Sequence, residues 1–191
     1  MIWKDHSKEV PEGAHAFLSP SKVSWLRYSD EHLKEMWLSN KASLEGTEMH
    51  ELAATLIRKR VKLKGTRQTF NMYVNDAIGY RLTPEVPLYF SPICFGTADA
   101  IGYDSKKKIL RIHDLKTGTR SKPHMEQLFI YAALFCLDYD IDPYDLEDIV
   151  TRLYFLDDII EDHPEPEEID GIMKTIVDFN NKIIKLEEEE D

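Results

Sequence analysis

Residues 93–116 read ICFGTADAIGYDSKKKILRIHDLK, and this stretch decides the fold. Two β-prone runs, 93–103 and 109–115, flank a polar segment of Asp, Ser and Lys that has the composition of a turn. Another β-prone run, 85–90, precedes them directly after Pro84. The three runs together predict an antiparallel meander.

Apolar residues at helical spacing predict helices on both sides of this meander along the chain. The pattern covers about 44–62 and 66–82 before it, and about 122–137 and 172–186 after it. The dipeptide Ser19-Pro20 predicts one further helix start, with the serine as N-cap and the proline at the first helical position.

A buried strand is expected at 149–156, joined to the meander by a helical crossover, and the acid- and proline-rich segment 161–169 is expected to be a loop. This order predicts an α/β fold in which a mixed sheet of about four to five strands is flanked by helices. We assign it to a single domain over 1–191. Its parts are a helical part (1–83), the sheet with a following helix (84–157), and an acidic loop with a C-terminal helix (158–191).

The composition is that of an ordinary globular protein, with 42% hydrophobic and 31% charged residues. No apolar run approaches the roughly 18 residues that cross a bilayer, and the N-terminus lacks the apolar stretch of a signal peptide. We therefore expect a cytoplasmic protein without membrane contact. Cys94 and Cys136 stand far apart and form no CxxC pattern, so neither a disulfide framework nor a zinc or iron–sulfur cluster is expected.

The formal net charge of −11 argues at first against binding to nucleic acid, whose phosphates attract Lys and Arg. The acid is segregated, however. Residues 138–170 hold 14 Asp or Glu against one Arg, and 187–191 hold five more acids, so the rest of the chain carries a net charge of +7. Basic clusters at 58–67 and 106–122 either bind an anionic partner or form ordinary solvated surface.

Asp99, Asp114 and Lys116 form the candidate site. Asp114 and Lys116 are two residues apart and so project from one face of their strand, and Asp99 stands on the preceding strand. Two carboxylates that meet on a sheet repel each other unless a cation lies between them, and their oxygens suit Mg²⁺ or Mn²⁺. A lysine beside such an ion can orient the attacking water and stabilise negative charge on phosphate. These are the parts that phosphodiester hydrolysis needs.

With these residues and their surroundings the chain resembles the PD-(D/E)XK nucleases, and among them the RecB-like branch and a related group of phage-encoded nucleases. The similarity covers most of residues 15–135 and implies a restriction-endonuclease-like core. It rests on five motifs in family order: Leu18-Ser19-Pro20-Ser21, Glu45-Gly46-Thr47-Glu48-Met49-His50-Glu51-Leu52, Gly96-Thr97-Ala98-Asp99, Ile112-His113-Asp114-Leu115-Lys116-Thr117-Gly118, and Gln127 with Tyr131.

The resemblance implies a role for each matching residue. Asp99, Asp114 and the backbone carbonyl of Leu115 would coordinate Mg²⁺ or Mn²⁺, with His50 as a further ligand from its helix. Lys116 would activate the attacking water.

Gln127 and Tyr131 match the QxxxY motif, and because they are four residues apart they share one helix face, from which they would help to hold the DNA strand. Ala98 stands where the family name has a proline, which is a common substitution in this branch. The cysteines that bind an iron–sulfur cluster in some relatives are absent, so that cofactor is not expected.

The implied activity is metal-dependent cleavage of DNA, and the analogy favours an exonuclease that processes DNA ends in phage-type recombination or replication. Its partners would be DNA and a recombination or single-strand-binding protein. Relatives that close into rings around DNA imply a homo-oligomer.

Several alternatives stay open. The chain could be a catalytically silent DNA-binding or assembly module with the same fold, or a regulator whose acidic segments mimic DNA or dock a basic partner, and an RNA substrate is also compatible. His50 is either a ligand or a plain core or surface residue. Glu85 is expected to be a surface residue rather than a metal or DNA contact, and His113 to point away from Asp114 without a catalytic role.

Overall fold

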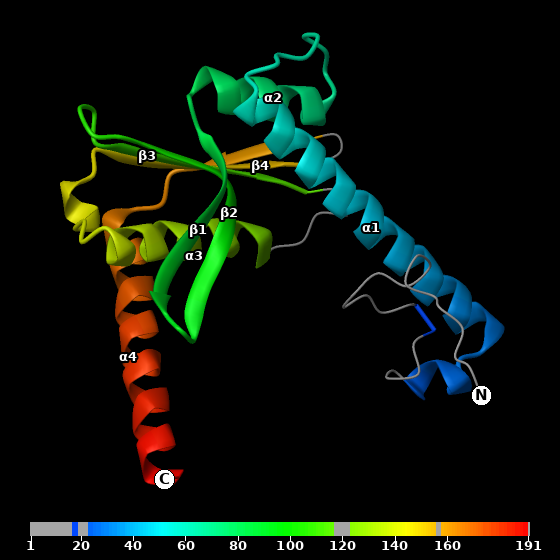
Figure 1. Ribbon diagram of the computed structural model, residues 1–191. Helices are drawn as coiled ribbons and strands as arrows, with labels where there is room; N and C mark the ends of the chain where they lie inside the picture. The colour runs from blue at the N-terminus through cyan, green and yellow to red at the C-terminus, as the bar shows by residue number, and fades with distance from the viewer. Residues whose placement is uncertain (1–16, 19–22, 117–122, 156–157, 191) are drawn as a thin grey trace, which may run out of the picture. The chain divides into compact units, whose positions relative to one another are not determined.

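The computed structural model describes residues 17–18, 23–116, 123–155 and 158–190 (Figure 1). Contacts between Cα atoms divide the chain into two compact units, Met1–Glu45 and Gly46–Asp191. The elements are η1 (Val23–Arg27), α1 (Asp30–Arg58), α2 (Thr69–Gly79), β1 (Thr83–Ser91), β2 (Cys94–Asp104), β3 (Ile109–Leu115), α3 (Pro123–Asp138), η2 (Pro143–Asp145), β4 (Asp148–Tyr154), β5 (Ile159–Asp162) and α4 (Pro166–Glu190).

The first unit contains η1 and the first half of α1. Helix α1 begins much earlier than the predicted residue 44, because the Ser29 hydroxyl accepts a hydrogen bond from the His32 N–H at 3.2 Å and so acts as an N-cap. Residues 30–45 are almost all exposed, so this part of the helix has no buried face. The helix start predicted at Ser19-Pro20 lies outside the described residues.

The second unit is built on a five-stranded sheet in the order β1-β2-β3-β4-β5. Strands β1, β2 and β3 pair antiparallel, which confirms the predicted meander, and β5 pairs antiparallel with β4. Strands β3 and β4 are parallel, so α3 serves as the crossover between them, as expected. The predicted mixed α/β fold is therefore confirmed.

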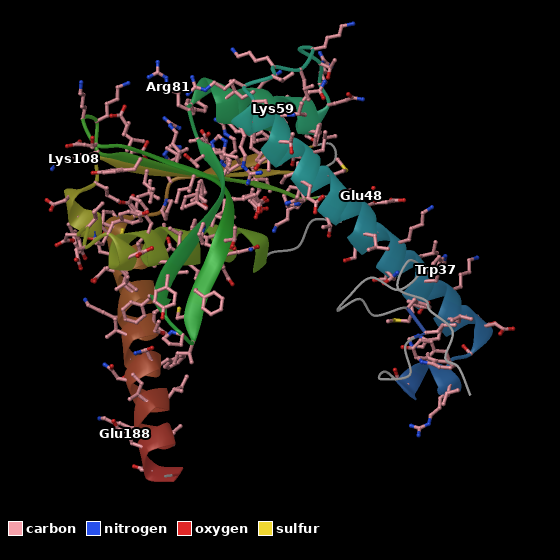
Figure 2. All side chains as sticks on the ribbon, viewed as in Figure 1. Trp37, Glu48, Lys59, Arg81, Lys108 and Glu188 are labelled. Carbon is pink, nitrogen blue, oxygen red and sulfur yellow. The ribbon has the colours of Figure 1, made fainter. Side chains whose placement is uncertain are left out.

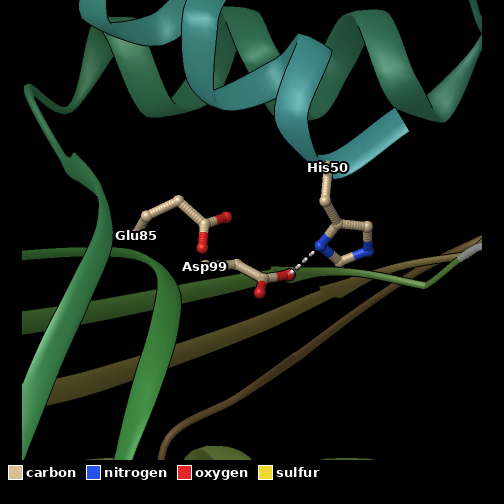
Figure 3. A group of neighbouring side chains, drawn as sticks. All are labelled: His50, Glu85 and Asp99. Carbon is tan, nitrogen blue, oxygen red and sulfur yellow. Dashed lines mark ion pairs between the residues drawn. The ribbon is translucent and has the colours of Figure 1, made fainter. Parts of the chain in front are cut away.

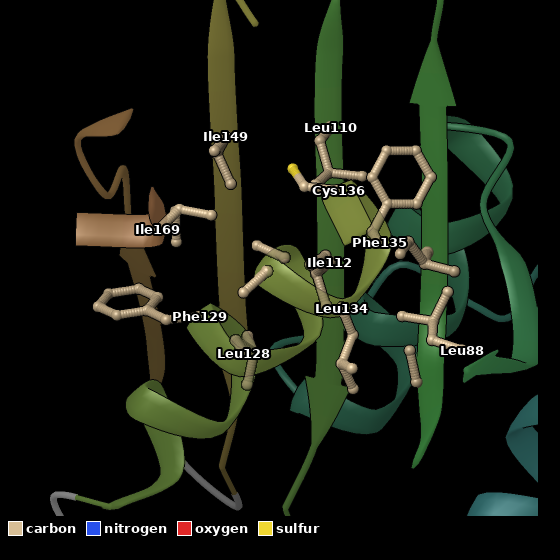
Figure 4. Packing of buried hydrophobic residues seen from close by; sticks show 14 of the residues in the cluster. Leu88, Leu110, Ile112, Leu128, Phe129, Leu134, Phe135, Cys136, Ile149 and Ile169 are labelled. Atoms are coloured by element: carbon tan, nitrogen blue, oxygen red, sulfur yellow. The ribbon is translucent and has the colours of Figure 1, made fainter. Parts of the chain in front are cut away.

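Helix α3 covers one face of the sheet, where the larger hydrophobic core lies (Figure 4). Leu128 and Ala132 of α3 are completely buried, as is Leu110 of β3. Helix α3 could be recognised from the sequence because nearly every residue after Gln127 is apolar, which only a helix buried in a core requires.

The C-terminal part of α1 and helix α2 cover the other face. Ala53 and Ile57 of α1 and Val74 of α2 pack there against Leu115 and Tyr154 at the ends of β3 and β4. The sheet is thus covered on both sides, and the ends of its central strands lie between the helices. None of the described helices is both long and apolar enough to cross a membrane.

The loop predicted at 161–169 is wrong at both ends. Strand β5 reaches Asp162, and α4 begins at Pro166, a residue suited to the first helical position. Arg152 of β4 and Glu161 of β5 are register partners and form an ion pair. The first acidic residues of the predicted loop therefore belong to an edge strand, where the Arg152 guanidinium pairs with Glu161. Apolar positions of α4 from Ile169 onward pack on the α3 side of the sheet.

Helices α1 and α2 end earlier than their predicted ends at Lys62 and Leu82. Arg60 and Arg81 follow these helices with φ angles of 54° and 60°, and each is flanked by the backbone hydrogen bonds of a Schellman motif. The sequence contains no sign of this end, because the left-handed position usually belongs to glycine and here holds arginine.

Replacing Arg60 by glycine should stabilise the fold. A side chain in the left-handed region costs about 1 kcal/mol that glycine avoids, so we expect Arg60→Gly to raise the free energy of unfolding by about that amount. The preceding Lys59 has no such φ angle, and Lys59→Gly should lower the same quantity. Urea unfolding of both variants measures this, and equal effects would contradict the interpretation.

His113 is a buried polar residue of β3 on the α2 side of the sheet. Its side chain is 0% exposed, and its Nδ1 lies 3.3 Å from the Tyr154 hydroxyl, which donates a 2.8 Å hydrogen bond to Asp76 of α2. Burial, followed by the nearby positive charges of Arg152 and Arg111, lowers the pKa of His113 to about 3. His113 was expected to point away from Asp114, and its ring is buried on the α2 side of the sheet, opposite the α3 core.

This histidine should make the fold less stable in mild acid. In the unfolded chain its pKa is near 6.5, so between about pH 6.5 and pH 3 only the unfolded state binds the proton, and stability falls as the pH falls. The contribution approaches about 1.4 kcal/mol per pH unit. In urea titrations at pH 4.5, 5.5 and 6.5, the variant His113→Phe should show a shallower pH dependence than wild type, whereas an unchanged slope would refute the assignment.

Candidate functional site

The two aspartates of the candidate site stand where the ladder between β2 and β3 ends. The last residue pair of the ladder is Ala100 with His113, and one step further in the same register Asp99 stands opposite Asp114. The Leu115 N–H donates a 3.1 Å hydrogen bond to Asp99 Oδ2 instead of to a strand carbonyl. The carboxylate of Asp99 therefore takes over the role of the missing ladder partner.

The β1–β2 hairpin twists sharply at the same point. Ala98 packs in the α3-side core, but Ala100, two residues on, packs in the core under α1 and α2, although such neighbours in a regular strand share a face. Glu85 of β1, which lies opposite Asp99 in this register, has a φ of 53°. The twist brings both acidic residues to the end of α1.

His50, Glu85 and Asp99 meet there as a compact group (Figure 3). One ligand atom from each residue can be chosen so that all three lie within 4.8 Å of one another. His50 Nδ1 is 3.2 Å from Asp99 Oδ2, and all three residues are partly exposed. Glu85 was expected to be a surface residue. It is partly exposed, and a backbone twist that has no sequence signature places it in this group.

Asp114, Lys116, Gln127 and Tyr131 form a chain of polar contacts beside this group. Lys116 Nζ donates to Asp114 Oδ1 at 3.1 Å and to Gln127 Oε1 at 2.9 Å. The Gln127 amide in turn lies 3.5 Å from the Tyr131 hydroxyl, at the limit of hydrogen bonding. The lysine is thus held between β3 and α3 by two acceptors, and its side chain is only 19% exposed.

The main chain at Leu115 also faces the group. The Lys116 N–H donates to the Tyr154 carbonyl of β4 at 2.8 Å, while the Leu115 N–H points the other way, to Asp99. In a strand the N–H and C=O of one residue point toward the same neighbour. The Leu115 carbonyl is therefore directed to the Asp99 side of β3, as a ligand role would require.

Negative charge accumulates in this region. Burial, and then the negative charge of Asp99, raises the pKa of Asp114 well above its ordinary value against the opposing effect of Lys116. Burial and the charge of Asp99 also raise the pKa of Glu85, and the hydrogen bond to Asp99 raises the pKa of His50. The negative charge of Asp99 thus contributes to all three shifts, after burial at the two carboxyl groups.

The donor set fits a hard divalent cation. Carboxylate oxygens with one imidazole nitrogen suit Mg²⁺ or Mn²⁺, and such an ion would offset the crowded negative charge. In addition, Asp114 Oδ2 is buried and accepts no hydrogen bond from the described residues, although Lys116 Nζ is 3.0 Å away. The compact ligand group contains Glu85 and does not include Asp114, in contrast to the set that the resemblance implied.

A cavity of about 410 Å³ opens beside Lys116, between α1, the start of α2 and the end of β3. Its walls are mostly apolar, with the lysine and two amide side chains among the polar groups, which is the usual composition of a site for a small organic ligand. It is lined by Met49, Leu52, Gln68, Thr69, Phe70, Asn71, Leu115 and Lys116.

The predicted site residues thus gather in one region, and the structure adds Glu85 to them. The motif residues Thr117 and Gly118 lie outside the described part of the chain. The comparison with known families found no family model that matches, and no curated protein matches the chain either.

Metal binding can be tested by thermal unfolding. An ion that binds only the folded state raises the melting temperature, so Mn²⁺ should stabilise the wild-type protein. Asp99→Asn should abolish the shift and Glu85→Gln should reduce it, since each removes a charged ligand. Glu48→Gln is the matched control, because Glu48 is an exposed acid two residues before His50. A full shift in Asp99→Asn would show that the ion binds elsewhere.

Proposed function

We propose that this protein hydrolyses phosphodiester bonds of DNA with the help of Mg²⁺ or Mn²⁺. The observation that carries the proposal is the position of Lys116. Its ammonium group lies 2.9 Å from Gln127 and 3.0 Å from Asp114, next to the group of His50, Glu85 and Asp99. A metal site and a fixed cation side by side can together stabilise the charge that develops when a phosphodiester is hydrolysed.

The residues of the site would have separate roles in hydrolysis. His50, Glu85 and Asp99 would hold the ion, with the Leu115 carbonyl directed to the same place. A bound divalent ion would polarise the phosphate and lower the pKa of a bound water. Lys116 Nζ, fixed by its two acceptors, would orient the water and stabilise charge that develops on the phosphate oxygens.

The basic cluster 58–67 supports DNA as the substrate. Its Lys and Arg residues are exposed and lie at the end of α1 and on the connection to α2; Figure 2 labels Lys59 among them. They are on the same side of the sheet as His50, Glu85 and Asp99, which we call the metal-ligand group. Burial and the charge of Asp99 raise the pKa of Glu85, and Arg58 is close enough to offset part of that rise. A DNA backbone whose phosphates bind this cluster would run toward the group of His50, Glu85 and Asp99.

The resemblance to the PD-(D/E)XK nucleases adds the type of reaction. It favours an exonuclease that processes DNA ends, which would act with a recombination or single-strand-binding partner. A homo-oligomer enclosing DNA belongs to the same proposal, as does action in the cytoplasm.

Cleavage assays with end-labelled DNA test the proposal. Linear and closed-circular substrates, single- and double-stranded, are incubated with Mn²⁺, Mg²⁺ or EDTA. We expect metal-dependent cleavage of linear DNA, and a loss of about 100- to 1,000-fold in Lys116→Ala, as for removal of one group that stabilises a transition state. Asp99→Asn should lose activity to a similar extent.

Lys108→Ala is the matched control, because Lys108 is an exposed lysine of the β2–β3 turn outside the site, and it should cleave at the wild-type rate. Binding of DNA without cleavage under every condition would instead identify a catalytically silent module. Equal activity in wild type and Lys116→Ala would assign the cleavage to another site or to a contaminant.

A further inference from the structure

The far end of the β1–β2 hairpin exposes large apolar side chains. Tyr89 is 52% exposed, Ile93 45% and Phe95 66%, although all three belong to one short stretch of the sheet or its turn. Scattered apolar residues need no explanation, but a group at one end of a hairpin indicates a binding surface. Figure 1 shows this end extending beyond the part of the sheet that β3 and β4 cover.

Two of these residues form an aromatic platform, by which we mean the rings of Tyr89 and Phe95. They are direct register partners, their ring centroids are 6.3 Å apart, and their planes differ by 23°. The Tyr89 N–H donates to Asp138 Oδ2 at 3.1 Å, so the edge strand is anchored to the end of α3 at this residue.

The platform lies on the same hairpin face as the metal-ligand group. A Cβ at Gly96 would lie 3.0 Å from Tyr131 of α3, and Ala98 packs in the α3-side core, so both point toward α3. Alternation places Phe95 and Thr97 on the opposite face, and the contact of Asp99 with His50 of α1 places Asp99 there as well.

The partner strand follows the same alternation. Tyr89 and Pro87 lie opposite Phe95 and Thr97 in the register, and Glu85 stands opposite Asp99. Four residues of strand span about 13 Å. One exposed stripe therefore leads from the carboxylates, past uncharged Pro87 and Thr97, to the platform.

We propose that this stripe binds an unpaired DNA strand, with one or more bases stacked on Tyr89 and Phe95 while the strand's phosphodiester reaches the metal-ligand group. Aromatic side chains bind bases of single strands through their π-faces, and in a duplex those faces are already covered by neighbouring bases. The stripe carries no Lys or Arg, so it suits bases rather than phosphates. The inference rests on the proposed nuclease function and names its substrate, a single-stranded or frayed end.

Binding is best measured by fluorescence anisotropy with the full chain in EDTA, where the proposed cleavage is absent. Tyr89→Ala/Phe95→Ala should weaken binding of a single-stranded oligonucleotide by about 10-fold or more, as loss of base stacking does. It should leave binding of blunt duplex, and of an abasic oligonucleotide of equal length, unchanged. Tyr144→Ala is the control, because Tyr144 is 54% exposed but belongs to η2.

A second variant guards against misfolding of the first. Phe95→Trp keeps the platform, and its added fluorescence should be quenched by the normal oligonucleotide and not by the abasic one. Quenching by both, or equal loss of affinity for both in the alanine variant, would overturn the proposal. A dimer in sedimentation that the alanine variant dissociates, with unchanged binding of the oligonucleotide, would overturn it in favour of a second copy of this chain.

The proposed nuclease activity and the proposed base binding can be tested independently of each other. Hydrolysis of bis(p-nitrophenyl) phosphate with Mn²⁺ needs no base, so the alanine variant should keep the wild-type rate on it while its KM for single-stranded DNA rises about 10-fold. Cleavage that depends on Lys116 but shows an unchanged KM in the alanine variant would overturn the platform and leave the nuclease proposal standing. Base-dependent binding without hydrolysis of either substrate would support the platform and remove the nuclease.

Discussion

The hydrogen bond from the Leu115 N–H to Asp99 Oδ2 is the contact on which the candidate site depends. It replaces a ladder bond exactly where β2 leaves β3, and it fixes the carboxylate that also contacts His50. Because a buried N–H must find a partner, the separation of the two strands is tolerable only if a side chain supplies an acceptor. The strand end and the aspartate therefore require each other, and the polar cluster follows from the geometry of the sheet.

Without a bound cation, the carboxyl groups of this region are in an electrostatically unfavourable arrangement. Burial, and then the charge of Asp99, raises the pKa of both Glu85 and Asp114, and the positive charge of Lys116 offsets only part of the rise at Asp114. Residues of this kind cost stability and are found where function requires them. The remainder of the acid lies in the segment 138–170 and the C-terminal tail, so the overall charge of −11 says little about the charge near the site.

Much of this arrangement was predictable from the sequence, because it depends on local patterns. The meander, the crossover helix and the shared strand face of Asp114 and Lys116 follow from alternation and spacing, whereas the approach of Asp99 depends on where the β2–β3 ladder ends. The place of Glu85 beside Asp99 could not be predicted, because it depends on a positive φ in a twisted strand. The ends of α1 and α2 could not be predicted either, because arginine occupies positions that glycine usually marks. Strand β5 was not predicted because Glu161 is stabilised there by an ion pair with Arg152, nine residues earlier, and the pattern of apolar residues contains no sign of that pair.

Gly96 explains why two motifs some thirty residues apart act together. A methyl group at this position would come within 3.0 Å of the Tyr131 ring, so the absence of a side chain on β2 lets α3 approach closely. That approach brings Gln127, one turn before Tyr131, within 2.9 Å of Lys116 at the end of β3. The glycine of β2 thus positions the lysine indirectly, by setting how closely the helix that carries its acceptor packs on the sheet. The aromatic platform lies on the opposite face of the hairpin, where Asp99 contacts His50 of α1.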